Sequence, residues 1–155
     1  MVLAGVLGAI SLLVVVGCGG GSSSSSSGDA GGSGSDGGSF ASGAEAACAG
    51  ANKQIAALGT PQQEQVLEYM EKTETVIEGL DEEVRALGAS GAAEAAYTEA
   101  LGKSVIVLNQ MTNAARSENF DAVRELSAGL IELHLGELAE AAELKACAEV
   151  PGTAS

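Results

Sequence analysis

Three cysteines and one histidine are the side chains of this sequence best suited to covalent or acid–base chemistry. A cysteine thiolate can be alkylated to a stable thioether, can form a disulfide or can bind a metal, and histidine exchanges a proton near neutral pH. Cys18 ends an apolar segment, whereas Cys48 and Cys147 lie near the two ends of the chain that follows. These positions suggest one role for Cys18 and another for the pair.

Cys18 follows an apolar run without charge, MVLAGVLGAISLLVVV, and precedes a segment of Gly and Ser. An apolar run that ends in an abrupt change of composition is typical of a secretion signal with a processing point. The run falls just short of the ~20 residues that a membrane-spanning helix needs. We therefore predict a signal peptide over residues 1–17, with an uncleaved membrane anchor as the alternative.

The residues Val15-Val16-Gly17-Cys18 resemble the lipobox of bacterial lipoproteins, in which two small or aliphatic residues and a Gly or Ala precede an invariant Cys. The resemblance implies that Cys18 becomes the mature N-terminus and carries diacylglycerol on its sulfur. Burial of acyl chains contributes ~0.8 kcal/mol per methylene, so two or more chains attach a protein persistently. The expected location is the cell membrane, lipid-anchored on the extracytoplasmic side. The alternative is that Cys18 is an ordinary small apolar residue.

Residues 18–43 contain the tract GGGSSSSSSGDAGGSGSDGGS, and Phe40 is their only large side chain. Such a segment cannot bury enough apolar surface to offset the entropy lost on ordering. We predict a lipidated Cys followed by a flexible, disordered Gly/Ser linker. A random coil of this length spans roughly 25 to 30 Å, which would place the folded unit clear of the lipid head groups.

The segment 44–150 is predicted to be all-α. Its apolar residues recur at alternating steps of three and four, which is the helical period. Aromatic residues are only 3% of the chain and Trp is absent, so the core must be built from aliphatic side chains. The clearest apolar seam follows Pro61 and contains Val66, Met70, Thr73, Ile77, Leu80, Val84 and Leu87.

We expect a short N-terminal helix over 44–58, followed by three long helices that begin after the N-cap residues Thr60, Ser90 and Ser117. The third long helix would run from near Glu118 towards Cys147 and would be the most buried element. Because the connections are very short, successive helices should be antiparallel neighbours. The expected fold is an antiparallel up-down helical bundle, followed by a C-terminal tail over 151–155.

If Cys18 carries lipid, Cys48 and Cys147 remain and flank the folded unit. Outside the cytoplasm they could form a disulfide, whose loop of about 100 residues would contribute up to ~4.7 kcal/mol. In unbroken helices the two residues would lie ~25 to 30 Å apart along the axis. A bond therefore requires a break in the last helix, at Gly129 or Gly136, or a partly extended first segment. Free buried thiols and an intermolecular bond are the alternatives.

The layout also resembles small exported proteins and lipoproteins of high-GC Gram-positive bacteria whose function is not characterised. They share a lipobox, a Gly/Ser linker, a Cys-x-x-x-Asn helix start and a Cys close to the C-terminus. The matching residues are Cys48-Ala-Gly-Ala-Asn52 and Leu144-Lys-Ala-Cys147-Ala. The resemblance implies a helical fold and paired cysteines, and it supplies no activity.

The formal net charge of −14 opposes binding to DNA or RNA. The Glu-rich face of residues 62–87 could collect Ca²⁺ or face a basic partner, but a straight helix splays its carboxylates, so a solvated face is the simpler interpretation. His134 lies near Glu137 and Glu140, which allows a weak metal site, a pH-sensitive pair or a histidine that is partly buried against a carboxylate. With one histidine, a multi-His metal centre is excluded. We predict no metal, no cofactor and no catalytic residue.

Two apolar stretches, Val105–Leu108 and Leu130–Leu138, could line a groove for an apolar ligand or a partner helix, although they are more simply the core of the bundle. Tyr97 could be a packing residue with a hydrated hydroxyl or a ligand contact.

The function expected from these observations is that of a lipid-anchored, non-catalytic module of the cell envelope that contacts a protein or cell-wall partner. The alternative is a carrier or sensor that binds a small apolar ligand or a cation within the bundle.

Overall fold

The computed structural model describes residues 37–150, and side chains from Phe40 to Val150. The predicted signal peptide, Cys18 and the C-terminal tail lie outside these residues. Within 37–150 the secondary structure is entirely helical, without a strand, which confirms the all-α prediction. The elements are α1 (Gly37–Leu58), the 3₁₀ turn η1 (Gln63–Gln65), α2 (Val66–Leu87), α3 (Ala92–Arg116), α4 (Phe120–Ile131), α5 (Leu135–Ala141) and α6 (Lys145–Ala148).

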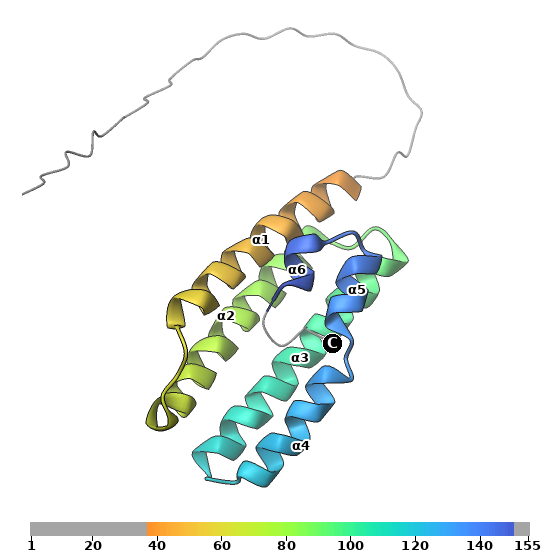
Figure 1. Cartoon of the computed structure of the whole chain (residues 1–155). Helices are drawn as coiled ribbons and strands as arrows, with labels where there is room; N and C mark the ends of the chain where they lie inside the picture. Colours follow the sequence, from red (N-terminus) through yellow and green to blue (C-terminus); the bar gives the residue numbers. More distant parts are fainter. Residues whose placement is uncertain (1–36, 151–155) are drawn as a thin grey trace, which may run out of the picture. The chain divides into compact units, whose positions relative to one another are not determined.

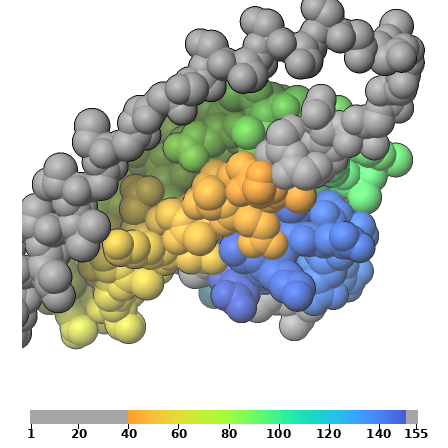
Figure 2. All heavy atoms as spheres, turned by 90° about the horizontal axis from the view of Figure 1, so that it is seen from above, coloured from red at the N-terminus to blue at the C-terminus, as the bar shows by residue number. Residues whose placement is uncertain are grey.

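Helices α2, α3 and α4 each pack against the helix before them, and the two short C-terminal helices pack back against earlier helices (Figure 1). The helix α5 contacts α3, and α6 contacts α1. Figure 2 shows α1 in orange and yellow between α2 in green and the C-terminal helices in blue. The first helix therefore has two packed sides, one towards α2 and one towards α6.

Helix α1 begins at Gly37, which corrects both the linker boundary at residue 43 and the expectation of a short first helix. The helix has 22 residues and is rich in Ala, the best helix former. Phe40, which we placed in the linker, is only 1% exposed. Its position one turn before Ala44 and two turns before Cys48 extends the buried face of α1 towards the N-terminus.

Helix α2 confirms the middle of the seam predicted for it, because Ile77, Leu80 and Val84 are buried, whereas Val66 and Leu87 at its two ends are exposed. The helix ends at Leu87, where Gly88 adopts a left-handed φ of 71°, as its position after the seam predicted. The start differs from the prediction, because the chain first makes η1 after Gln62, two residues beyond Thr60. The predicted caps of the next two helices are also displaced: Gly91 caps α3 and Asn119 caps α4.

The long last helix predicted from near Glu118 to Cys147 is wrong, because the chain forms α4, α5 and α6 instead. The breaks do not fall at Gly129 or Gly136, which lie inside helices. They fall at His134, with φ of 50°, and at Glu143, with φ of 60°. At the second break the Leu144 N–H donates to the Ala139 carbonyl oxygen at 2.8 Å, which gives a carbonyl group in the last turn of α5 a hydrogen-bond donor.

The core gathers around the C-terminal helices and α1. Helix α4 has no fully buried residue, so the expectation that the last segment would be the most buried applies only to its α5 and α6 portions. The most deeply buried large side chains come from α1, α2, α3 and α6 with its N-cap residue. They are Phe40, Cys48, Val84, Tyr97, Leu144 and Cys147.

Replacing Phe40 with Ala should lower the free energy of unfolding by about 3 to 5 kcal/mol, because a buried aromatic side chain leaves a cavity. Urea denaturation followed by circular dichroism measures the change. The matched control is Phe120→Ala, because Phe120 is 62% exposed and its loss should cost less than about 0.5 kcal/mol. Equal losses in the two variants would show that Phe40 is not part of the core.

The start of α3 should make stability depend on pH. The Glu94 carboxylate accepts hydrogen bonds from the N–H groups of Ser90 and Gly91 and from the Ser90 hydroxyl, and these bonds lower the pKa of Glu94 from 4.5. Because the pKa is lower in the folded state, the ionised group adds stability above the unfolded pKa, and this contribution is lost as the pH falls through the folded value.

Glu94→Ala should therefore be less stable than the natural chain at pH 7, and the difference should shrink as the pH falls below about 4. Chemical denaturation at a series of pH values measures it. The control is Glu125→Ala, on an exposed position of α4. A difference that stays constant down to acid pH would contradict the assignment.

Candidate functional site

Cys18, the residue expected to carry lipid, lies outside the described residues, as does the apolar run before it. The structure therefore leaves the lipid anchor as a prediction. Among helices in the described part of the chain, none combines the length and the apolar character needed to cross a bilayer.

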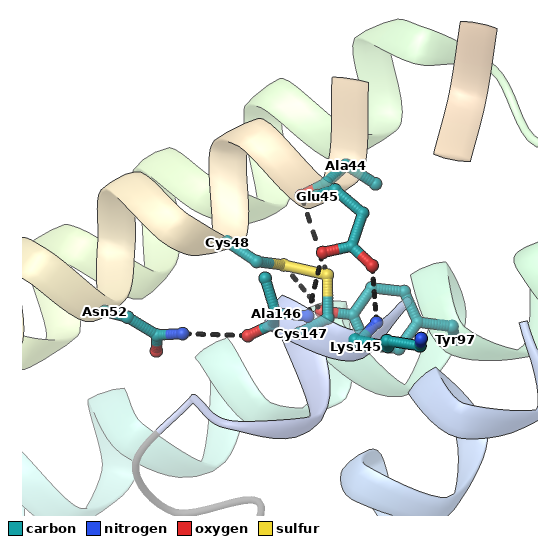
Figure 3. Close-up of a disulfide and its surroundings, with 8 residues drawn as sticks. All are labelled: Ala44, Glu45, Cys48, Asn52, Tyr97, Lys145, Ala146 and Cys147. Atoms are coloured by element: carbon teal, nitrogen blue, oxygen red, sulfur yellow. Dashed lines mark hydrogen bonds between the residues drawn. A yellow bond between two sulfur atoms is a disulfide. The ribbon is translucent and has the colours of Figure 1, made fainter. Parts of the chain in front are cut away.

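Cys48 and Cys147 are joined in the structure as a disulfide within one chain (Figure 3). Their Cα atoms lie 4.9 Å apart, and both residues are completely buried. The distance expected for unbroken helices is removed by the breaks at His134 and Glu143, which let the chain turn back to α1. The bond links α1 directly to α6, the last helix of the described chain.

Two polar side chains of α1 hold α6 beside the disulfide (Figure 3). The Glu45 carboxylate accepts hydrogen bonds from the N–H groups of Lys145 and Ala146, the first residues of α6. A carboxylate at a helix N-terminus satisfies unpaired N–H groups and interacts favourably with the helix dipole. The Asn52 amide donates to the Ala146 carbonyl oxygen at 2.8 Å.

We name this group the α1–α6 clasp: Glu45, Cys48, Asn52 and Cys147, with the backbone of residues 145 and 146. Sequence reasoning identified its cysteines and named Asn52 only as part of the Cys-x-x-x-Asn pattern, and it missed Glu45. The spacing of Glu45, Cys48 and Asn52 is a usable signal, since steps of three and four place all of them on one side of a helix.

Tyr97 lies in contact with the clasp from α3. Its hydroxyl oxygen lies 3.4 Å from Cys48 Sγ, and because a disulfide sulfur carries no hydrogen, the hydroxyl is the donor. Burial, with a smaller effect from the negative charge of Glu45, raises the pKa of Tyr97, so the phenol keeps its proton. The hydroxyl is buried and packs against the disulfide, and it is not the hydrated group that we considered.

His134 does not form the arrangement expected from a continuous helix. It lies in the left-handed turn before α5, and its Nδ1 atom is 3.4 Å from a carboxylate oxygen of Glu137. The His134 side chain is 59% exposed, which corrects the interpretation of a partly buried histidine, and an exposed pair of this kind contributes little to stability. Within residues 37–150, no group of three or more His, Cys, Asp or Glu side chains is placed to hold a metal ion.

Most acidic side chains of α2 are exposed, and several pair with nearby basic groups. Glu68 pairs with Lys72, and Asp81 pairs with Arg85, one turn along the same helix. Glu71 pairs across to Arg116 of α3. Glu74 departs from the solvated face predicted for residues 62–87, because it is buried and accepts a hydrogen bond from the Asn109 amide at 2.7 Å.

The two apolar stretches considered for a ligand groove contribute to packing. Val105, Leu108, Leu133 and Leu138 pack against the buried core, and Leu135 belongs to it. Ile106 of α3 and Ile131 of α4 are exceptions, since each is 59% exposed.

A different groove lies between α1 and α2, and sequence reasoning did not find it. Three adjoining cavities of about 420, 490 and 220 Å³ share residues along the two helices. We name this surface the α1–α2 groove. Its lining includes Gly43, Gly50 and Gln54 of α1 and Val76, Gly79 and Glu83 of α2.

Comparisons of the chain with protein-family models, with curated proteins and with solved structures gave no match.

Replacing Cys48 and Cys147 together with Ala should lower the free energy of unfolding by about 2 to 5 kcal/mol, because the bond closes most of the described chain into one loop. Denaturant unfolding of the oxidised chain and the double variant measures the loss. Intact mass after denaturation and reduction should rise by two hydrogen atoms in the natural chain and should not change in the variant.

Cys18→Ala is the control for this experiment, and it should leave the unfolding free energy unchanged. If iodoacetamide labels Cys48 and Cys147 in the denatured chain before reduction, they are free thiols and the intramolecular bond is wrong. A dimer that separates only on reduction would instead indicate the intermolecular bond.

Proposed function

We propose that this protein is a lipid-anchored, non-catalytic module of the cell envelope. A lipid on Cys18 would hold it on the extracytoplasmic side of the cell membrane, where it contacts a protein or cell-wall partner. Residues 19–36 would connect the anchor to α1, and their composition of Gly, Ser, Asp and Ala is that of a linker.

The observation that carries this proposal is the buried Cys48–Cys147 bond. Disulfides persist outside the reducing cytoplasm, so an internal bond between these residues supports export. It also accounts for the odd number of cysteines, because it leaves Cys18 as the single thiol available for lipid.

The side chains that could take part in acid–base chemistry near the disulfide have structural partners instead, which supports a non-catalytic role. The Tyr97 hydroxyl donates to a disulfide sulfur, and the Glu45 carboxylate accepts from the backbone of α6. Both groups therefore stabilise the fold in a buried or partly buried setting.

We further infer that α1 to α4 are arranged as an antiparallel up-down bundle, completed by α5 and α6. Leu87, at the end of α2, lies beside Gly43 near the start of α1. Glu71 in the first half of α2 pairs with Arg116 at the end of α3. These contacts support opposite directions for neighbouring helices. Such a bundle would be a rigid support for a binding surface.

Detergent-phase partitioning and intact mass measurement test the anchor. The natural chain, extracted from its own membranes, should enter the detergent phase with a mass that corresponds to cleavage before Cys18 plus acyl chains. Cys18→Ala should lose the lipid and the cleavage, whereas the double variant of Cys48 and Cys147 should keep both.

An unprocessed N-terminus without lipid would overturn the lipoprotein proposal and indicate a helical protein held by its uncleaved apolar segment. A small molecule that copurifies with the natural chain would favour the carrier alternative.

A further inference from the structure

Two helical glycines line the α1–α2 groove where the structure gives no packing reason for glycine. A Cβ atom added to Gly50 or Gly79 would meet no other atom within 4 Å. Neither residue has a left-handed φ. Gly inside a helix costs about 0.5 to 1 kcal/mol relative to Ala. The effect of both glycines is to leave the groove open and to expose backbone, as is usual where a ligand approaches closely.

The groove has the length of a short helix. The cavities overlap at Gln54 and Val76, and again at Leu58 and Lys72, so they form one continuous depression. From Gly43 to Leu58 the distance along α1 is roughly 22 Å at 1.5 Å per residue, which equals about four helical turns. Its lining includes the half-buried side chains of Ala47, Leu58 and Val76, so a small apolar helix face would find apolar contacts there.

The surroundings of the groove are acidic. Glu83 lines one end, and Glu68 and Glu71 line the other. Glu78 and Glu82 are exposed nearby on α2. Lys72 also lines the groove and is paired with Glu68, and Glu71 is paired with Arg116 of α3, so the unpaired negative charge comes from Glu83 and from the neighbouring Glu78 and Glu82. The electrostatic field at this surface therefore favours a cationic partner.

Charge and side-chain size separate the possible occupants. A second copy of this chain carries the same formal charge of −14 and would be repelled. Residues 19–36 have no basic side chain and none larger than Asp, so they cannot fill the groove or neutralise its rim.

We propose that the α1–α2 groove binds a basic amphipathic helix of a partner protein, about four turns long, with small apolar residues on the floor and Lys or Arg towards the acidic rim. This inference rests on the proposed function, because it names the class of partner that the anchored module contacts. It selects a protein partner over the cell wall.

Selection from a displayed library of 16-residue peptides on the full-length chain tests the groove without a known ligand. Gly50→Leu and Gly79→Leu fill it from its two walls, and both variants should fold at least as stably as the natural chain. Gly129→Leu is the matched control, because Gly129 also lies in a helix with no atom within 4 Å of an added Cβ, but on α4. Thermal unfolding by circular dichroism checks that all three variants fold.

Enriched peptides should carry net positive charge and an apolar face at helical spacing. Their affinity should fall at least about tenfold for Gly50→Leu and Gly79→Leu, should fall for Glu83→Lys, and should be unchanged for Gly129→Leu. Failure to enrich peptides, enrichment of neutral or acidic peptides, or affinities that the groove variants do not alter would each overturn the proposal. Self-association that the groove variants abolish would also overturn it, in favour of a second copy.

The partitioning experiment on Cys18 separates failure of the lipid anchor from failure of the groove as a binding site. A lipidated chain that enriches no basic helix would leave the anchored module standing and remove the groove as its binding site. A chain without lipid that still binds such peptides through the groove would retain the site and overturn the anchor.

Discussion

The bond between Cys48 and Cys147 constrains the elements between them, because it closes a loop that contains α2 to α5. Helix α6 depends on this bond most directly. It has only four residues, far fewer than an isolated helix needs to be stable in water. The α1–α6 clasp supplies what the short helix lacks: a carboxylate at its first N–H groups, an amide on the Ala146 carbonyl and a covalent bond to α1.

The return of the chain to α1 requires turns that the sequence does not signal with glycine. Glu118, His134 and Glu143 all adopt positive φ values, which cost L-residues roughly 1 to 2 kcal/mol each. The burial of Leu135, Leu144 and Cys147 immediately after the last two turns offsets this cost, since a fully buried aliphatic side chain contributes about 1.5 to 3 kcal/mol. Long-range packing and the disulfide therefore set where the C-terminal segment breaks.

The difference between local and long-range interactions explains which parts of the structure could be predicted from the sequence. The buried seam of α2 could be predicted because helical periodicity is local, and Gly88 ends the helix where its position indicated. The start of α1 could not, because Phe40 and Ala44 stand in Gly- and Ser-rich sequence whose composition conceals their helical spacing. The clasp joins residues about 100 positions apart, so its polar contacts follow from tertiary structure alone. The α1–α2 groove was hidden for the same reason: Gly50 and Gly79 belong to different helices.

Helix α1 connects the stability of the fold to its candidate binding surface, because the two use different sides of the same helix. Glu45, Cys48 and Asn52 belong to the α1–α6 clasp, whereas Gly43, Gly50 and Gln54 line the α1–α2 groove. The clasp fixes α1 against the C-terminal segment, while the apolar seam fixes α2 against the core. Both walls of the groove are thus held in place before any partner arrives, which reduces the entropy lost on binding. A covalently closed core also tolerates the two helical glycines, since their combined cost is smaller than the stabilisation of about 2 to 5 kcal/mol expected from the disulfide.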